Sequence, residues 1–405
     1  MKILMLTPYA PFSPNSSGGR IRMWEEIQYL GRRHDLTVVS FVFSREEYEL
    51  REALASRCNR VIAVMLPNKP SPSKRQDQRR LPWPVRRCVT TEMRKTLESL
   101  QKVNFDLVLI EHIFMAEYRD LFSICTVLEE HNIESNIFKQ LARIQPSSME
   151  ISEEKISKQE ERALLHATWM HVARYENQTW PKFPLRITVS ENDKQELDRR
   201  CPTGRTIVIE NGINTQSITP VANNGSRKIL FMGTMDYIPN VDAVFYLREH
   251  ILPRIWQKDP TISLVIAGRN PPQKVRSLAS NPRIEVFANP EDMSEIAKDC
   301  CLTVVPLRIG GGTRIKIPHS MAMGLPVVST SLGSEGLSVV DGVHILIRDE
   351  PEQFADAVLQ IISDPALRNN LRTNGRRLVE ERYDWSRMFE RLEMEIISLV
   401  NSSKC

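Results

Sequence analysis

Two glycine clusters, each followed by basic residues, form the strongest chemical pattern in this sequence. In the second cluster, Gly310, Gly311 and Gly312 follow an apolar run, and Arg314 and Lys316 come directly afterwards. Glycine allows the backbone to approach a ligand closely, and the N–H groups at the start of a helix attract anions. The spacing predicts a helix amino terminus that binds a diphosphate. The alternative is a glycine loop that serves only a tight turn between strand and helix.

The first cluster lies near the start of the chain, where Gly18 and Gly19 precede Arg20 and Arg22. We expect these glycines to open a helix whose exposed N–H groups could hold a phosphate or a transition-state anion. The surrounding sequence is neither GxGxxG nor GxxxxGK[ST], which argues against a dinucleotide site and a P-loop site. An ordinary loop and helix cap is the competing interpretation.

The composition indicates a folded, soluble protein of two or three domains. The chain has 405 residues, of which 41% are hydrophobic and 26% are charged. A net charge of +4 is too small for the whole molecule to bind nucleic acid through its field. The seven cysteines include no CxxC pair, which favours buried thiols in a reducing compartment over a disulfide framework or a zinc site. Neither a signal peptide nor a run of about 18 apolar residues is found, so we expect a cytoplasmic protein.

Short apolar runs alternate with longer amphipathic ones, which is typical of parallel sheets covered by helices. A polar linker at residues 215–227 separates two such series, and residues 134–180 are expected to be helical with a break near Pro146. Three helices at residues 351–363, 365–381 and 385–400 follow the last strand. The predicted strands are residues 2–6, 36–43, 60–66, 106–110, 124–128, 186–190 and 206–209 in the first series, and 228–232, 263–267, 283–287, 301–306, 326–329 and 344–347 in the second.

Several strings resemble the retaining glycosyltransferases of family four, also called group-one glycosyltransferases. These strings are GGGTRIKIPHSMAMGLPVVSTSLGSEGL, VSENDKQEL, VIENGINT, FMGTMDYIPNVDAVFYL and the amino-terminal TPYAPFSPNSSGGRIR. The resemblance covers nearly the whole chain and implies the α/β GT-B architecture, in which two Rossmann-like domains with parallel sheets face each other across a cleft. It implies an acceptor-side domain at residues 1–208 and a nucleotide-sugar domain at 209–384. The helix within 385–405 is a candidate to pack back on the first domain.

The resemblance also implies roles for individual residues. It places His112, at the end of a strand, near the reacting sugar, although a histidine there is often structural. It places Asn211 and Gly212 where the chain crosses between the domains. The residues expected along the diphosphate sugar are Gly18, Gly19, Arg20, Gly233, Gly311, Gly312, Thr313, Arg314, Lys316, His319 and Glu335.

The sequence departs from the family pattern at the donor site. The E-x7-E motif would place acids at Gly311 and His319, and both acids are absent. His319 could make one hydrogen bond to a ribose but not the charged, bidentate contact of a carboxylate. The usual Arg-x4-Lys pair would fall on Thr234 and Pro239. We therefore expect Arg314 and Lys316 to offset the diphosphate charge.

The implied reaction is transfer of a hexose-type sugar from a nucleotide-diphosphate donor to an acceptor hydroxyl, with retention at the anomeric carbon. The resemblance implies no metal or other cofactor, and the sequence has no DxD motif. A phosphate oxygen of the leaving group would take the acceptor proton. Glu111 is a weaker candidate for a base, because an acid at a strand end is more often structural.

Two further functions stay open on the sequence alone. One is a GT-B sugar-nucleotide 2-epimerase, and the other is a degenerate GT-B protein that binds a partner or a sugar nucleotide without turnover. The basic stretch at residues 69–95 suits a peripheral contact with an anionic membrane surface or a phosphorylated lipid acceptor. A solvated loop is the alternative there. No stacking platform for nucleic acid is found.

Overall fold

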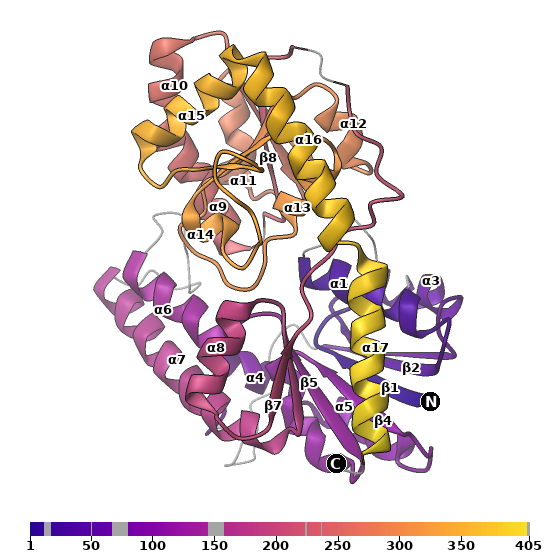
Figure 1. The fold of residues 1–405 in the computed structure, drawn as a ribbon. Coiled ribbons are helices and arrows are strands. Elements are labelled where there is room, and N and C mark those ends of the chain that lie inside the picture. The colour runs from indigo at the N-terminus through magenta and orange to yellow at the C-terminus, as the bar shows by residue number, and fades with distance from the viewer. Residues whose placement is uncertain are drawn as a thin grey trace.

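The structure, a computed structural model, describes residues 1–11, 18–49, 51–66, 80–144, 158–222, 225–235 and 237–402. Its main features are two parallel sheets, each in its own α/β domain, stacked one above the other in Figure 1. This confirms the predicted fold class. The thirteen predicted strands are all present, with ends that differ from the predicted ones by one or two residues.

The first sheet has the strand order β3-β2-β1-β4-β5-β6-β7, and all its pairs are parallel. The chain therefore reverses its direction of winding at β1, so that loops after β1 and β4 diverge and leave room for a ligand. The strands are β1 (Lys2–Thr7), β2 (Asp35–Val42), β3 (Arg60–Met65), β4 (Leu107–Glu111), β5 (Cys125–Glu130), β6 (Leu185–Thr188) and β7 (Arg205–Val208). The helices are α1 (Gly18–Leu30), α2 (Arg45–Glu49), α3 (Arg51–Ala55), α4 (Trp83–Cys88), α5 (Thr91–Leu100), η2 (Ile113–Leu121), α6 (Glu134–Ile144), α7 (Lys158–Thr179), η3 (Trp180–Lys182) and α8 (Glu191–Arg200).

The second sheet has the order β10-β9-β8-β11-β12-β13, again with parallel pairs, and it reverses its winding at β8. Its strands are β8 (Lys228–Met232), β9 (Ser263–Gly268), β10 (Ile284–Ala288), β11 (Leu302–Val305), β12 (Val327–Ser329) and β13 (Leu346–Ile347). The helices around it are α9 (Ile238–Tyr246), η4 (Leu247–Ile251), α10 (Leu252–Lys258), α11 (Gln273–Arg276), η5 (Ser277–Ser280), α12 (Met293–Ala297), α13 (Lys316–Ala322), α14 (Ser331–Ser334), α15 (Pro351–Ser363) and α16 (Pro365–Arg382).

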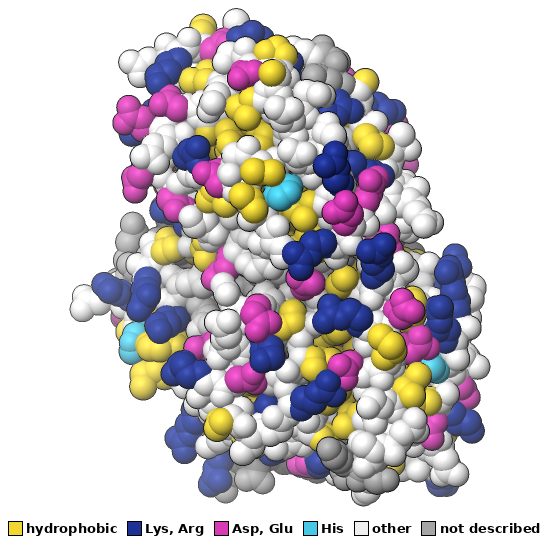
Figure 2. Space-filling view, in the orientation of Figure 1, with side chains coloured by type: hydrophobic (Ala, Val, Ile, Leu, Met, Phe, Trp, Pro, Cys, Tyr) yellow, Lys and Arg dark blue, Asp and Glu magenta, His cyan; other side chains and the backbone are white. Residues whose placement is uncertain are grey.

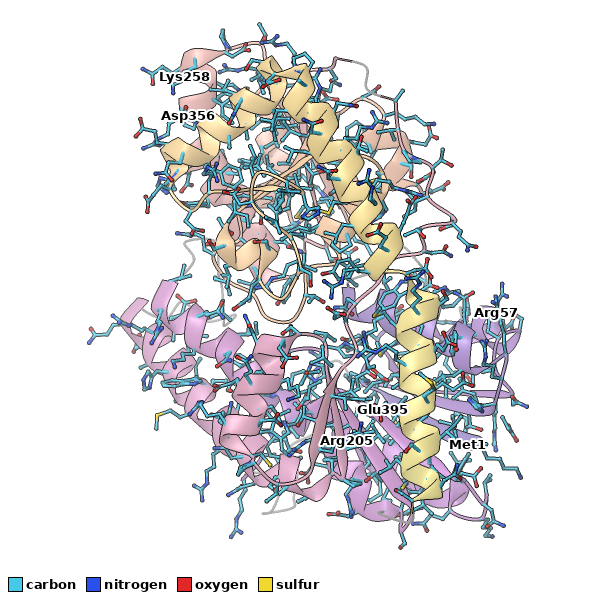
Figure 3. The ribbon with its side chains drawn as sticks, viewed as in Figure 1. Met1, Arg57, Arg205, Lys258, Asp356 and Glu395 are labelled. Carbon is cyan, nitrogen blue, oxygen red and sulfur yellow. The ribbon has the colours of Figure 1, made fainter. Side chains whose placement is uncertain are left out.

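The last helix, α17 (Trp385–Asn401), leaves the second domain and lies along the first, as Figure 1 shows. Its buried residues Trp385, Phe389 and Leu392 share a hydrophobic core with strand β1 and helix α1. In its second half, Glu395 makes an ion pair of 2.7 Å with Arg205 of β7, and Figure 3 labels both side chains. The chain thus crosses between the domains twice, once before β8 and once before α17.

Three predicted features fall partly outside the described residues. Helices α6 and α7 form the predicted helical segment, but the break near Pro146 lies outside the described part. The same holds for residues 12–17 of the first glycine loop and for residues 69–79 of the basic stretch.

Candidate active site between the two domains

The second glycine cluster forms a loop that reaches across from the second domain onto the first. Ile309 and Ile315 flank this loop, and each is buried in a hydrophobic cluster of the first domain. The side chain of Gln140 on α6 holds the backbone of Gly310 by two hydrogen bonds, of 2.8 Å from its N–H and 3.0 Å to its C=O. Residues 310–314 therefore lie in the interface between the domains.

The sequence analysis placed the start of a helix at these glycines, and the structure corrects this. Helix α13 begins only at Lys316. Gly312 has a φ of 62°, a left-handed conformation that a right-handed helix cannot contain. A Cβ atom there would lie 2.4 Å from the carbonyl oxygen of His131. The glycines serve close contact between the domains.

The first glycine cluster does open a helix, because α1 starts at Gly18. A Cβ atom at Gly18 would lie 3.4 Å from Cδ1 of Ile315, so the start of α1 contacts the second domain. A Cβ atom at Gly19 would lie 2.8 Å from Nδ1 of His131 and 2.7 Å from Oη of Tyr9. The absence of a side chain at Gly19 is what lets both polar atoms reach the helix terminus.

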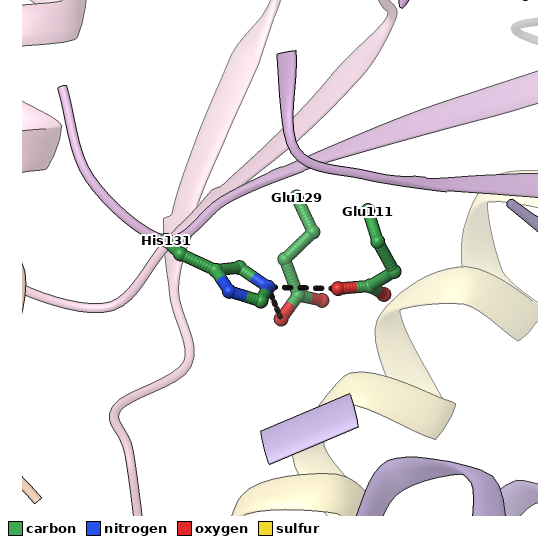
Figure 4. A group of neighbouring side chains, drawn as sticks. All are labelled: Glu111, Glu129 and His131. Atoms are coloured by element: carbon green, nitrogen blue, oxygen red, sulfur yellow. Dashed lines mark hydrogen bonds and ion pairs between the residues drawn. The ribbon is translucent and has the colours of Figure 1, made fainter. Parts of the chain in front are cut away.

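His131 therefore lies between the two glycine clusters. It is buried, its Nε2 is 2.8 Å from Oε2 of Glu111, and its Nδ1 has no hydrogen-bond partner among the described residues. Figure 4 shows the imidazole pointing at Glu111 and Glu129, the carboxyl groups of two adjacent strands. Burial lowers the pKa of His131 well below its ordinary value, so the ring is neutral at pH 7.

A buried arginine on α1 completes this cluster. The Nε of Arg22 donates to Glu129, and its Nη1 donates to Oδ1 of Asn211 at 3.2 Å. The carboxyl group of Glu26, also fully buried, has no hydrogen-bond partner among the residues whose structure is described. Burial, together with the charge of Glu129, raises the pKa values of Glu26 and Glu111 well above the ordinary value.

Three residues of this cluster are of types that bind metal ions. Glu111, Glu129 and His131 each offer one ligand atom, and these atoms lie within 4.8 Å of one another. The guanidinium of Arg22 already neutralises Glu129. A cation would be repelled by that guanidinium and would have to displace the hydrogen bond to His131. The residues present do not fit a metal, and we assign none here.

His112, the predicted catalytic histidine, lies next to His131, with ring centroids 6.0 Å apart. It follows β4 in a left-handed conformation with a φ of 76°, which is unusual for a residue other than glycine. Its Nε2 is 3.0 Å from Oε1 of Glu134, and its Nδ1 accepts a hydrogen bond from the N–H of Phe114 at 3.4 Å. Both ring nitrogens have partners within the protein, whereas His131 keeps one free. The role of His112 stays a prediction.

Two predicted cations lie behind the glycine loop. Arg314 is buried, donates to the C=O of Gly312 and approaches Oε2 of Glu335 at 3.5 Å. The half-buried Lys316 donates to Oδ1 of Asn240 at 2.6 Å. Burial, together with the nearby charge of Arg314, lowers the pKa of Lys316 to about 7. Within the described ranges, neither Nε of Arg314 nor the buried hydroxyl of Thr313 has a hydrogen-bond partner.

The remaining predicted residues border the same region or its supports. A Cβ at Gly233 would lie 3.1 Å from Nζ of Lys316, so this glycine leaves room for the ammonium group. Asn211 donates to the C=O of Thr313 at 3.3 Å and thereby joins the two domains, and Gly212 packs on the ring of Trp385. Burial lowers the pKa of His319 to about 4. Arg20 differs from the others, because its guanidinium bonds Glu47 and the C=O of Ala10 at 2.9 Å each.

The sequence analysis missed two residues that the structure brings to this site. His131 was missed because strand β5 ends at Glu130, two residues beyond the predicted end, so the histidine was not recognised as the residue that leaves the strand. Asp193 lies in the first turn of helix α8, where the hydroxyl of Ser190 donates to its carboxylate at 2.6 Å. It therefore looked like part of a helix cap and was not predicted as a site residue. It faces Arg314 and accepts from the backbone of Gly312, and burial raises its pKa. His131 could have been predicted from its position, because polar residues directly after parallel strands often face a ligand site.

A polar pocket of about 260 Å³ adjoins the other side of the glycine loop. It is lined by helices α6 and α8 of the first domain and by the loop of the second, with Asn136, Asp193 and Glu335 among its residues. On the face drawn in Figure 2, basic and acidic side chains are interspersed, in agreement with the small net charge. None of the helices that the structure describes combines the length and the apolar character needed to span a membrane.

Comparisons with known proteins bear on this arrangement. Residues 226–364 match the family model described as "Glycosyl transferases group 1". An uncharacterized glycosyltransferase of Methanocaldococcus jannaschii is 26% identical over 208 residues, which are 50% of this chain and 56% of that protein. The chain spans about half the length of the curated relatives it matches.

Solved structures resemble this chain over nearly its full length. Sucrose-phosphate synthase from Thermosynechococcus elongatus has a TM-score of 0.70 at 16% identity and covers 100% of both chains. Anabaena HepE in complex with UDP-glucose has a TM-score of 0.68 at 13% identity, over 98% of this chain and 100% of that one. Residues 226–364 thus match the group 1 glycosyl transferase model, within a chain whose two-domain fold is the GT-B fold of the similar solved structures.

Proposed function

We propose that this protein is a retaining glycosyltransferase. It moves a hexose-type sugar from a nucleotide-diphosphate donor to an acceptor hydroxyl of a polysaccharide, glycolipid or metabolite, without a metal ion. The observation that carries the proposal is the meeting of two glycine segments from different domains. Gly18 and Gly19 at the start of α1 lie close to Ile315 and to the ring of His131, and Gly312 lies close to the carbonyl oxygen of the same His131.

The free polar atoms at this meeting point suit a diphosphate sugar. The start of the 13-residue helix α1 offers backbone N–H groups. His131 Nδ1, Thr313 Oγ1 and Arg314 Nε are buried and have no hydrogen-bond partner in the part of the chain that the structure describes, and such atoms are costly unless a ligand satisfies them. In the proposed reaction Arg314 and Lys316 stabilise the charge that develops on the leaving diphosphate. The acceptor proton passes to an oxygen of that leaving group.

UDP is the first nucleotide to test, because the similar HepE structures contain UDP and UDP-glucose. We expect UDP, or another nucleoside diphosphate from a panel of five bases, to raise the melting temperature in the presence of a chelator. A ligand at 100 times its Kd adds about 2.7 kcal/mol to the free energy of unfolding. If no nucleoside diphosphate of the panel raises the melting temperature, the proposed donor site is wrong. Binding without release of nucleoside diphosphate from any sugar nucleotide would favour a binding protein without turnover.

The affinity for the donor should depend on pH through Lys316. Its pKa of about 7 in the free protein means that the ammonium form is lost as the pH rises through 7. A bound diphosphate favours the ammonium form, so binding takes up a proton and the association constant falls by up to about tenfold per pH unit above 7. UDP-glucose is the suitable probe, because its phosphates do not titrate in this range. Calorimetry in buffers of different ionisation enthalpy measures the uptake.

Lys316→Arg is the control for this dependence, since a guanidinium stays charged throughout the range. The variant should bind UDP-glucose with an affinity that hardly changes between pH 6 and 8.5. An unchanged pH dependence in the variant would show that another group takes up the proton.

We also propose a cytoplasmic location with peripheral membrane contact through residues 69–95. In the described part of that segment, Trp83 is 51% exposed and helix α4 carries Arg86 and Arg87 in its last turn. An exposed indole beside basic residues suits an anionic lipid surface. Co-sedimentation with vesicles that contain phosphatidylglycerol, compared with the Trp83→Ala variant, tests this contact.

A further inference from the structure

The acidic cluster beneath His131 holds more carboxyl groups than cationic partners. Glu26, Glu111 and Glu129 are all fully buried, and among the described side chains one cation, the guanidinium of Arg22, lies with them. That guanidinium bonds Glu129, and its other hydrogen bonds go to the C=O of Glu210 and the amide of Asn211. One charge can neutralise one carboxylate. An unpaired ionised carboxylate in such a site is very costly, so the other two carboxyls keep their protons.

We infer that Glu111, held as a neutral carboxylic acid, donates its proton in the hydrogen bond to Nε2 of His131 and so fixes the tautomer that presents Nδ1–H to the interdomain site. The geometry supports this, because the contact of 2.8 Å joins Oε2 to the nitrogen that faces away from that site. A neutral imidazole carries one proton. If Nε2 accepts a hydrogen bond, the proton is on Nδ1.

The inference rests on the proposed function and assigns His131 a specific part in it. An Nδ1–H beside Gly19 is a donor, and it suits an oxygen of the diphosphate or of the sugar. It cannot accept the proton of an acceptor hydroxyl. Glu111 would act only through His131 and is a positioning residue.

The ionised state of Glu111 would give His131 the other tautomer. If Glu111 were ionised, Nε2 would carry the proton and Nδ1 would be a lone-pair acceptor, able to serve as a base. The groups that face Glu111 decide between the two states: Arg22 and Glu26 of α1, Glu129 of β5, His131 and His112 after the strands, and Tyr9. Arg22 favours the ionised form, whereas burial and the charge of Glu129 favour the neutral form. Because Arg22 is already bonded to Glu129, the neutral form prevails.

Nitrogen-15 NMR of the histidine rings tests the inference directly in the full chain without ligand. Two-bond couplings distinguish the two neutral tautomers, and His131→Gln identifies the signal of His131 among the eight histidines. We expect the Nδ1–H tautomer at pH 7. In Glu111→Leu, which lacks the donor, Nε2–H should become populated, and UDP should bind roughly fivefold more weakly, as expected for one lost hydrogen bond.

The outcomes separate this inference from the proposed function. An Nε2–H tautomer in the wild type at pH 7 would overturn the inference, as would an unchanged Nδ1–H signal in Glu111→Leu. Glu111→Gln, which keeps the volume and cannot ionise, should hold one tautomer from pH 6 to 9 and serves if the leucine variant does not fold. A change of tautomer with pH in Glu111→Gln would show that another group controls the ring. If UDP fails to bind the wild type, the proposed function falls while the tautomer measurement still decides the role of Glu111.

Discussion

Gly312→Ala should abolish most of the transferase activity while leaving each domain folded. Alanine at a φ of 62° is strained by about 1–2 kcal/mol, and the new Cβ would lie 2.4 Å from the carbonyl oxygen of His131. This oxygen is backbone and cannot move aside as a flexible side chain would. The glycine loop must therefore retreat from the first domain. A displacement of about 1 Å at a reacting centre can reduce the rate by about 100-fold, and we expect a loss of kcat/KM of this size.

Gly342→Ala is the matched control for this prediction. Gly342 has a similar φ of 76°, but no atom lies within 4 Å of the Cβ that alanine would add. It shares the backbone strain without the contact between the domains. The steady-state rate of nucleoside diphosphate release, measured for both variants, should fall for Gly312→Ala alone. Equal losses would mean that strain, rather than the approach of the domains, is responsible.

Arg314→Ala should weaken binding of a nucleoside diphosphate by roughly 10- to 100-fold, the effect of one lost charge-assisted hydrogen bond. Burial lowers the pKa of Arg314, but a guanidinium still stays charged at neutral pH. Its Nε, which has no hydrogen-bond partner among the described residues, and its place behind the glycine loop suit it to bind an anion. Isothermal calorimetry with UDP measures the loss.

Arg368→Ala controls for the removal of a buried arginine. Arg368 on α16 is also buried, and its guanidinium donates to the carbonyl groups of Ile361 and Ile362 at 3.2 and 3.0 Å. Its loss should lower the melting temperature without changing the affinity for UDP. A similar affinity for UDP in Arg314→Ala and the wild type would place the diphosphate elsewhere in the molecule.

The fold could be predicted closely from the sequence because its strands are buried on both faces. Such strands appear as continuous apolar runs, and helices such as α15 begin at a proline that cannot extend a preceding helix. The prediction ended strand β5 too early, at Leu128, before the two acidic residues Glu129 and Glu130. In the structure Arg22 bonds Glu129, and Nε1 of Trp180 donates to Glu130 at 2.6 Å. Those partners are distant in sequence, so no local pattern could identify them.

The candidate site could be predicted only where local sequence patterns identify its residues. The glycine clusters and the cations after them are local patterns, and the structure brings Gly18, Gly312 and Arg314 to one interface. Which histidine keeps a free nitrogen depends on tertiary contacts. Glu134 lies close to His112 and Glu111 lies close to His131, and only the packed sheet determines this pairing. The distinction between a helix start and a domain contact at Gly312 also needed the second domain in place.

Hydrogen exchange with and without UDP tests most directly whether the two glycine segments bind the same diphosphate. The account predicts that UDP slows exchange at the start of α1, from Gly18 to Arg22, and also in the loop from Gly310 to Arg314. These segments belong to different domains, and 288 positions separate Arg22 from Gly310. Protection in one segment alone, or protection confined to other parts of the chain, would contradict a diphosphate held between the two domains.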